Sequence, residues 1–122
     1  RVLFRSRSVL VVDDNLVNRK LAVALLQRRG MQTEEAENGL VALSKLANGY
    51  YDSVLLDISM PLMDGEEVCR HIRANTNWSE MRVIAYTAHA LESERSRIMA
   101  SGFDDVLIKP ISINDLLRVL PD

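Results

Sequence analysis

Four short runs of the sequence contain only apolar residues, and they constrain the fold more than any other feature. The runs are rich in β-branched residues and span residues 9–12, 54–56, 83–85 and 106–108. A strand covered on one face alternates apolar and polar residues, whereas a strand covered on both faces is apolar throughout. The runs therefore predict the buried strands of a parallel sheet with helices on both sides.

The segments between these runs have the period of amphipathic helices. Apolar residues recur at spacings of three and four at Val17, Leu21, Ala24 and Leu25, at Leu40, Leu43, Leu46 and Ala47, and at Ile113, Leu116, Leu117 and Leu120. Residues 32–36 are more polar, which predicts a strand at the sheet edge. With right-handed crossovers, five strand–helix repeats predict an α/β fold with a doubly wound, five-stranded parallel sheet flanked by five helices.

The length and charge of the chain limit its function. At 122 residues it fits one domain, which we place at residues 8–122, with the basic residues 1–7 as a linker. The net charge of −2 gives no reason to expect nucleic acid as a partner. Apolar runs are far shorter than the ~20 residues that span a bilayer. Cys69 is the only cysteine, so no internal disulfide can form, which favours a reducing compartment.

Polar side chains stand where the predicted strands end. Asp13 and Asp14 follow the first strand, Asp57 the third, Thr87 the fourth and Lys109 the fifth. An aspartate after a strand is usually a turn residue or a helix cap. Five such groups at four strand ends are harder to explain in that way, because the carboxyl ends of parallel strands meet at the edge where ligands bind. The sequence therefore predicts a site there.

The charges of these residues indicate the chemistry. Three neighbouring carboxylates repel one another, and a single lysine does not neutralise them. A hard dication does, and Mg²⁺ (or Mn²⁺) suits carboxylates, waters and a phosphate oxygen. Lys109 and Thr87 would then hold the other oxygens of a phosphoryl group in transfer. Asp57 stands alone at its strand end, so it is the better candidate for the nucleophile.

Four stretches of the chain resemble the receiver domains of two-component response regulators. They read VVDDN at residues 11–15, LDISMPLMDG at 56–65, AYTA at 85–88 and IKP at 108–110. The resemblance implies a flavodoxin-like fold with strand order 2-1-3-4-5 and a cis peptide bond between Lys109 and Pro110. It also implies that Asp57 is the phosphoacceptor and that Thr87 and Lys109 contact the phosphoryl oxygens. The implied Mg²⁺ ligands are Asp13, Asp14, Asp57 and the backbone carbonyl of Ser59.

Within this family, the run DNLVNR at residues 14–19 is typical of receivers attached to hybrid sensor kinases. The resemblance then implies a regulatory phosphoacceptor rather than an enzyme, in a phosphorelay or a switch. The expected partners are a sensor histidine kinase or a histidine phosphotransfer domain, in the cytoplasm, with no contact to nucleic acid or membrane by this domain. A weak homodimer through the fourth and fifth helices is left open.

One position departs from the family pattern. Many receivers carry Tyr or Phe three residues before the lysine, where the ring swings inward after phosphorylation. Here that position is Val106. We therefore expect phosphoryl acceptance without an aromatic switch, which favours a relay role.

Three other classes remain to be weighed. Haloacid-dehalogenase-like phosphatases also use a strand-end aspartate, but they need a second aspartate two residues later, where this chain has Ser59. A flavin-binding electron carrier would offer free amides to a phosphate, which Asp13 and Asp14 would repel. A degenerate receiver that only binds partners would lack the acceptor, the acids or the lysine, and this chain keeps them all.

Overall fold

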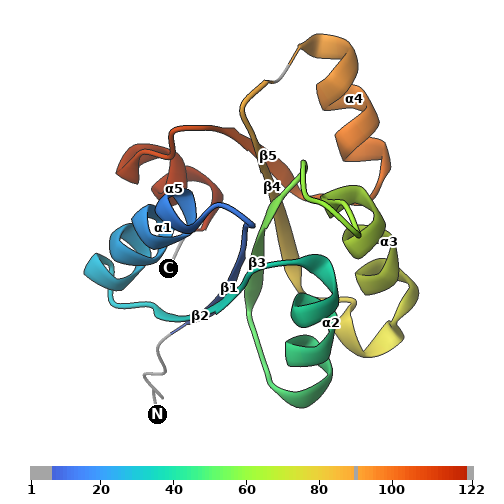
Figure 1. Cartoon of the computed structure of the whole chain (residues 1–122), viewed down its shortest axis with the longest axis horizontal. Helices are drawn as coiled ribbons and strands as arrows, with labels where there is room; N and C mark the ends of the chain where they lie inside the picture. Colours follow the sequence, from blue (N-terminus) through green and yellow to red (C-terminus); the bar gives the residue numbers. More distant parts are fainter. Residues whose placement is uncertain (1–6, 90, 121–122) are drawn as a thin grey trace.

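Five strands and five α-helices alternate along the described part of the chain (Figure 1). The structure is a computed structural model that describes residues 7–89 and 91–120, so most of the predicted linker lies outside it. The strands are β1 (Ser8–Val12), β2 (Gln32–Ala36), β3 (Ser53–Asp57), β4 (Arg82–Thr87) and β5 (Asp105–Ile108). The helices are α1 (Leu16–Arg28), α2 (Gly39–Asn48), α3 (Gly65–Ala74), α4 (Glu92–Ala100) and α5 (Ile113–Val119), with a 3₁₀ turn at Thr76–Trp78.

The strands form one parallel sheet in the order β2-β1-β3-β4-β5, which confirms the predicted fold class and strand order. All five residues of the central strand β3 are buried, which confirms that its apolar run at residues 54–56 is covered on both faces. Strand β2 lies at the edge, and exposed or half-exposed residues fill all but its last position. The polar composition of residues 32–36 therefore marked an edge strand correctly.

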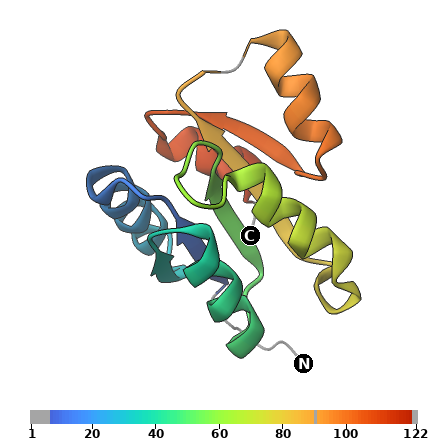
Figure 2. The ribbon, with the colours of Figure 1, turned by 45° about the vertical axis from the view of Figure 1, so that its right-hand side comes forward.

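The helices form one layer on each face of the sheet (Figure 2). Helices α1 and α5 cover one face, where Leu26 and Leu116 pack with Leu55 and Ile84 of the strands. Helices α2, α3 and α4 cover the other face. Helix α4 contributes little to the core, since Ile98 is its one buried residue. In the described part of the chain, no helix has the length and apolar character to cross a membrane.

Helix caps fix where the loops beyond β1 and β3 end. The side chain of Asn15 accepts a hydrogen bond from the amide of Asn18 at the start of α1. Asp64 accepts in the same way from the amide of Glu67 at the start of α3. Only two residues, Asp13 and Asp14, therefore separate β1 from the cap of α1.

The period of the sequence located α1, but the residues that carry the period do not form its buried face. Val17 is 75% exposed and Leu21 is 42% exposed, whereas Ala22, Val23 and Leu26 are buried. Apolar residues on α1 are so abundant that more than one stripe fits a helical period. Packing against the sheet selects the stripe that contains the small Ala22.

Candidate functional site

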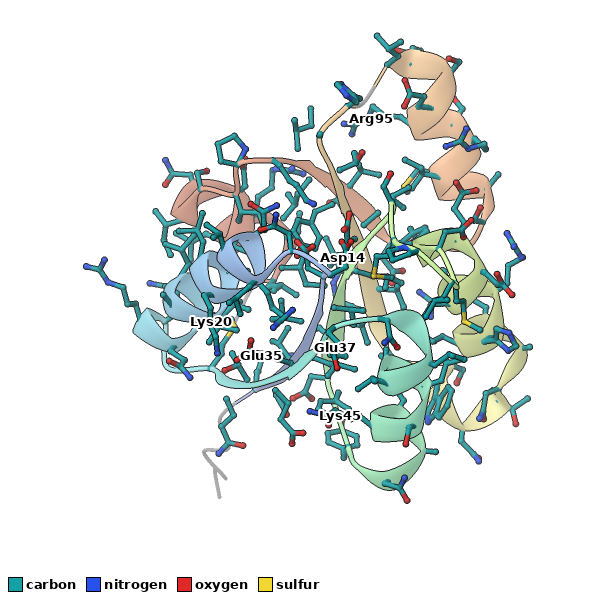
Figure 3. All side chains as sticks on the ribbon, in the orientation of Figure 1. Asp14, Lys20, Glu35, Glu37, Lys45 and Arg95 are labelled. Atoms are coloured by element: carbon teal, nitrogen blue, oxygen red, sulfur yellow. The ribbon has the colours of Figure 1, made fainter. Side chains whose placement is uncertain are left out.

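The predicted site residues lie together at the carboxyl edge of the sheet. Asp13 and Asp14 follow β1, Asp57 and Thr87 end β3 and β4, and Lys109 follows β5. Because all five strands are parallel, these positions share one edge. Figure 3 shows Asp14 there, beside the end of β1. The structure thus brings together five residues that are up to 96 positions apart in the chain, from Asp13 to Lys109 (109 − 13).

The three carboxylates are close enough to share a ligand. Each of Asp13, Asp14 and Asp57 offers one oxygen, and these oxygens lie within 4.8 Å of one another. Asp13 and Asp57 are 0% and 2% exposed, whereas Asp14 faces solvent. The Nζ of Lys109 lies 3.1 Å from Asp57 Oδ1 and 3.4 Å from Asp13 Oδ2, so one ammonium bridges the two buried acids.

The electrostatics of the site do not balance within the protein. Burial and, next to it, the neighbouring Asp13 together raise the pKa of Asp57 to about 7, although Lys109 acts in the opposite direction. A buried carboxylate with such a pKa is costly to ionise without an additional positive charge. The site therefore holds more negative than positive charge, because one ammonium faces three carboxylates.

The donor set of this cluster fits a hard dication. Carboxylate oxygens are the ligands that Mg²⁺ prefers, and an exposed Asp14 leaves room for the waters that Mg²⁺ keeps. Among the described residues, the group consists of three carboxylates without histidine or cysteine, a donor set that suits Mg²⁺ better than a softer transition metal. The chemistry of the residues present thus agrees with the predicted cation.

Thr87 and Ser59 occupy the rim of the site. Thr87 is 8% exposed, and its Oγ1 accepts a hydrogen bond from the amide of His89 at 3.3 Å. The amide of Ser59 donates to Asp57 Oδ1 at 3.2 Å, which orients the carboxylate. The roles of the Thr87 hydroxyl on a phosphoryl group and of the Ser59 carbonyl on a metal stay predictions.

Two supporting residues were not singled out from the sequence. Arg19 donates from Nη1 to the carbonyl of Asp13 and from Nε to Glu35, both at 2.8 Å, so it fixes the backbone of the acidic loop. A Cβ on Gly65 would lie 2.3 Å from the carbonyl oxygen of Asp57, so only glycine lets α3 begin directly behind that residue. Both stand inside quoted motifs, but their contacts depend on the tertiary fold.

A third unpredicted residue is Tyr86, whose hydroxyl donates to Asp13 Oδ2 at 2.5 Å in the buried interior. Burial and the carboxylate of Asp13 raise the pKa of Tyr86 above its usual range, so the hydroxyl remains a donor. The predicted features around Lys109 are also present. The Lys109–Pro110 bond is cis, and Val106 is 1% exposed within β5.

The family comparison agrees with this geometry. The family model of the response regulator receiver domain matches residues 9–120. The chain is 39% identical to the sensor protein GacS of Pseudomonas syringae over 119 residues, which covers 95% of this chain and 13% of GacS. It is 38% identical to the hybrid signal transduction histidine kinase I of Dictyostelium discoideum, covering 93% of this chain and 7% of that kinase. The chain therefore spans only a small part of these relatives.

A solved structure resembles the fold. The receiver domain of a Pseudomonas aeruginosa sensor histidine kinase, crystallised with a magnesium ion coordinated in its active site cleft, superposes with a TM-score of 0.86. The two sequences are 32% identical, and the match covers 94% of each chain.

Proposed function

Since the chain belongs to the response regulator receiver domain family, it is a phosphoacceptor signalling domain, and we propose that Asp57 is the residue that takes the phosphoryl group. The observation that carries this proposal is the position of Asp57 within the acidic cluster, where it shares the Lys109 ammonium with Asp13. It is the one acid of the cluster that ends a strand, and its Oδ1 is oriented by both Ser59 and Lys109.

The transfer we propose is an in-line displacement at phosphorus. An ionised oxygen of Asp57 forms the new P–O bond while the P–N bond of a phosphohistidine breaks and its electron pair stays on the imidazole nitrogen. Asp13, Asp14, Asp57 and the carbonyl of Ser59 would hold Mg²⁺, which supplies positive charge to the phosphoryl oxygens when bound. Lys109 neutralises a further oxygen, and the Thr87 hydroxyl donates to another.

The geometry also suggests how Asp57 becomes a nucleophile. With a pKa of about 7 in the protein alone, much of Asp57 is protonated at neutral pH and cannot attack phosphorus. Additional positive charge beside the carboxylate favours its ionised form. A divalent cation should therefore assist phosphoryl acceptance in two ways. It favours the ionised form of Asp57, and it neutralises charge on the phosphoryl oxygens.

We place the domain in a relay rather than in an aromatic switch. The buried Val106 supports this, because it has no ring to reorient when Thr87 moves toward a phosphoryl group. The proposed partners are a sensor histidine kinase and a histidine phosphotransfer domain in the cytoplasm. Residues 1–7 are proposed as the linker. The domain is proposed to catalyse only its own phosphorylation and dephosphorylation. Large chemical-shift changes around β4 and α4 upon phosphorylation would contradict the relay assignment.

Intact mass after incubation with acetyl phosphate and Mg²⁺ tests the proposal. We expect the protein to gain one phosphoryl group, and we expect no gain after chelation of Mg²⁺ or in the Asp57→Asn variant. Asp64→Asn is the matched control, because Asn caps a helix as well as Asp does. No gain in the folded parent protein, from this donor and from a phosphorylated histidine kinase, would leave a binding module without phosphoryl chemistry.

A further inference from the structure

Tyr86 is a buried residue whose polar end points into the acidic cluster. The side chain is 0% exposed and belongs to the core between the sheet and helices α1 and α5. Its hydroxyl donates to Asp13 Oδ2 at 2.5 Å, and the amide of Asn15 donates to Asp13 Oδ1 at 2.8 Å. Both oxygens of a carboxylate that is itself fully buried are therefore held by the protein.

Tyr86 also contacts the cationic side of the site. The Nζ of Lys109 lies 4.7 Å from the centre of the Tyr86 ring, within the range of a cation–π contact. The backbone carbonyl of Tyr86 accepts from the amide of Ile58 at 3.2 Å, directly beyond Asp57. Tyr86 thus contacts Asp13, Lys109 and the residue that follows Asp57. It also directly precedes Thr87 in the chain.

Packing around the ring does not explain why this position is tyrosine rather than phenylalanine. The residues around Tyr86 in this core are aliphatic, including Leu55, Ile84 and Leu107, so phenylalanine would fill the same space. A buried hydroxyl lowers stability unless it is hydrogen-bonded. Its bond here goes to a proposed metal ligand 73 positions away in the chain rather than to a nearby backbone carbonyl.

We propose that Tyr86 is a positioning residue for the cation site, which fixes the Asp13 carboxylate so that its orientation is set before a dication binds. This rests on the proposed function, because Asp13 is assigned there as a metal ligand. With Oδ2 anchored by the hydroxyl and Oδ1 by Asn15, the carboxylate plane is fixed by two donors. Loss of groups that orient metal ligands in this way typically weakens metal affinity by ~10–100-fold.

The test compares Tyr86→Phe with Tyr51→Phe. Tyr51 is also buried, and its hydroxyl donates at 3.0 Å to a carboxylate, that of Glu34, away from the cluster. Mg²⁺ affinity is measured on metal-free protein by titration calorimetry. Tyr86→Phe should weaken Mg²⁺ binding roughly tenfold, and Tyr51→Phe should leave it unchanged. In an Asp13→Asn background, adding Tyr86→Phe should weaken Mg²⁺ binding no further, because the hydroxyl acts through Asp13.

A second measurement separates this proposal from the proposed function. The amide of Asn15 reports the orientation of Asp13 by its NMR chemical shift, without any metal. We expect this resonance to move in metal-free Tyr86→Phe and not in Tyr51→Phe. Parent-like Mg²⁺ affinity or an unmoved Asn15 resonance in Tyr86→Phe would reduce Tyr86 to a core residue. A parent protein that binds no Mg²⁺ would instead overturn the proposed cation site, whatever the Asn15 resonance does.

Discussion

A cluster of charged side chains lies at each end of the parallel strands: at the amino edge, where the strands begin, and at the carboxyl edge, where they end. The two clusters differ in how their charges are balanced. At the amino edge, Arg73 of α3 pairs with Asp104 at 2.6 Å and donates at 2.8 Å to the carbonyls of Gly102 and Met81. Asp104 also accepts from the amide of Val83. One cation meets one anion there, and each has further hydrogen bonds.

The carboxyl edge is arranged in the opposite way. Lys109 faces two buried carboxylates, with exposed Asp14 as a third nearby. Measured on the side chains alone, these groups are also more deeply buried, with 18% exposure for Lys109 and 3% for Asp57, against 25% for Arg73 and 36% for Asp104. The balanced cluster ties α3 to the loops before β4 and β5. The unbalanced cluster accepts a cost in stability that a bound dication can offset.

The largest effect that this comparison predicts is at the amino edge. Arg73→Ala should lower the free energy of unfolding by about 2–3 kcal/mol, somewhat less than the loss of a fully buried pair, since Arg73 is partly exposed. Urea denaturation of metal-free protein measures it. Arg70→Ala, an exposed residue of the same helix, should change stability by less than about 0.5 kcal/mol. Equal effects of the two variants would show that the Arg73 cluster at the amino edge does not stabilise the fold.

An effect of similar size is expected at the carboxyl edge. At a hundredfold excess over its dissociation constant, Mg²⁺ should raise the stability of the parent protein by about 2.7 kcal/mol. Asp57→Asn should lose most of this gain, because one ligand is gone. Arg73→Ala should keep all of it, because Arg73 lies at the opposite edge. A Mg²⁺ gain that survives in Asp57→Asn would place the cation elsewhere.

The pH dependence of metal-free protein should distinguish the edges further. The folded-state pKa of Asp57, about 7, lies above the ~3.9 of an unfolded aspartate, so the folded state binds the extra proton. The parent should therefore lose stability relative to Asp57→Asn as pH rises from about 4 to 7, by at least about 1 kcal/mol, and the difference should level off above. Denaturation of both proteins with a chelator present measures this. A difference independent of pH would mean that Asp57 titrates normally.

The smallest effect concerns Glu35, an acid beside the site that pairs with two cations. Figure 3 shows Lys20 close to Glu35, which also accepts from Arg19. The hydrogen bond from Lys20, together with Arg19 and against a desolvation effect, lowers the pKa of Glu35. Glu35→Gln should therefore cost about 0.5–1 kcal/mol at neutral pH, and the cost should vanish as pH falls through the lowered pKa. Exposed Glu37→Gln is the control and should be neutral. An equal loss of stability in both variants would show that the ion pairs of Glu35 do not stabilise the fold.

Much of the site could be predicted because it depends on strand ends. Entirely apolar runs marked β1, β3, β4 and β5, and parallel strands necessarily bring Asp13, Asp57 and Lys109 to one edge. The chemistry followed from counting charges, since three acids and one lysine call for a cation.

The remaining features depend on tertiary packing. The buried face of α1 could not be chosen from the period, because Val17 and Leu21 fit a helix as well as Leu26 does. The partner of the Tyr86 hydroxyl is 73 positions away, so only the fold selects it. The requirement for glycine at position 65 likewise arises from the carbonyl of Asp57, which meets α3 only in the folded chain.

Direct location of the phosphoryl group tests the central claim. Protein treated with acetyl phosphate and Mg²⁺ is reduced with borohydride, which converts an acyl phosphate on aspartate to homoserine, and its tryptic peptides are sequenced by mass spectrometry. The account predicts homoserine at position 57, in the peptide that follows Lys45, and none when Mg²⁺ is chelated. Homoserine at Asp13 or Asp14 with Asp57 intact would contradict it, because the acids assigned to the cation would then be the acceptors.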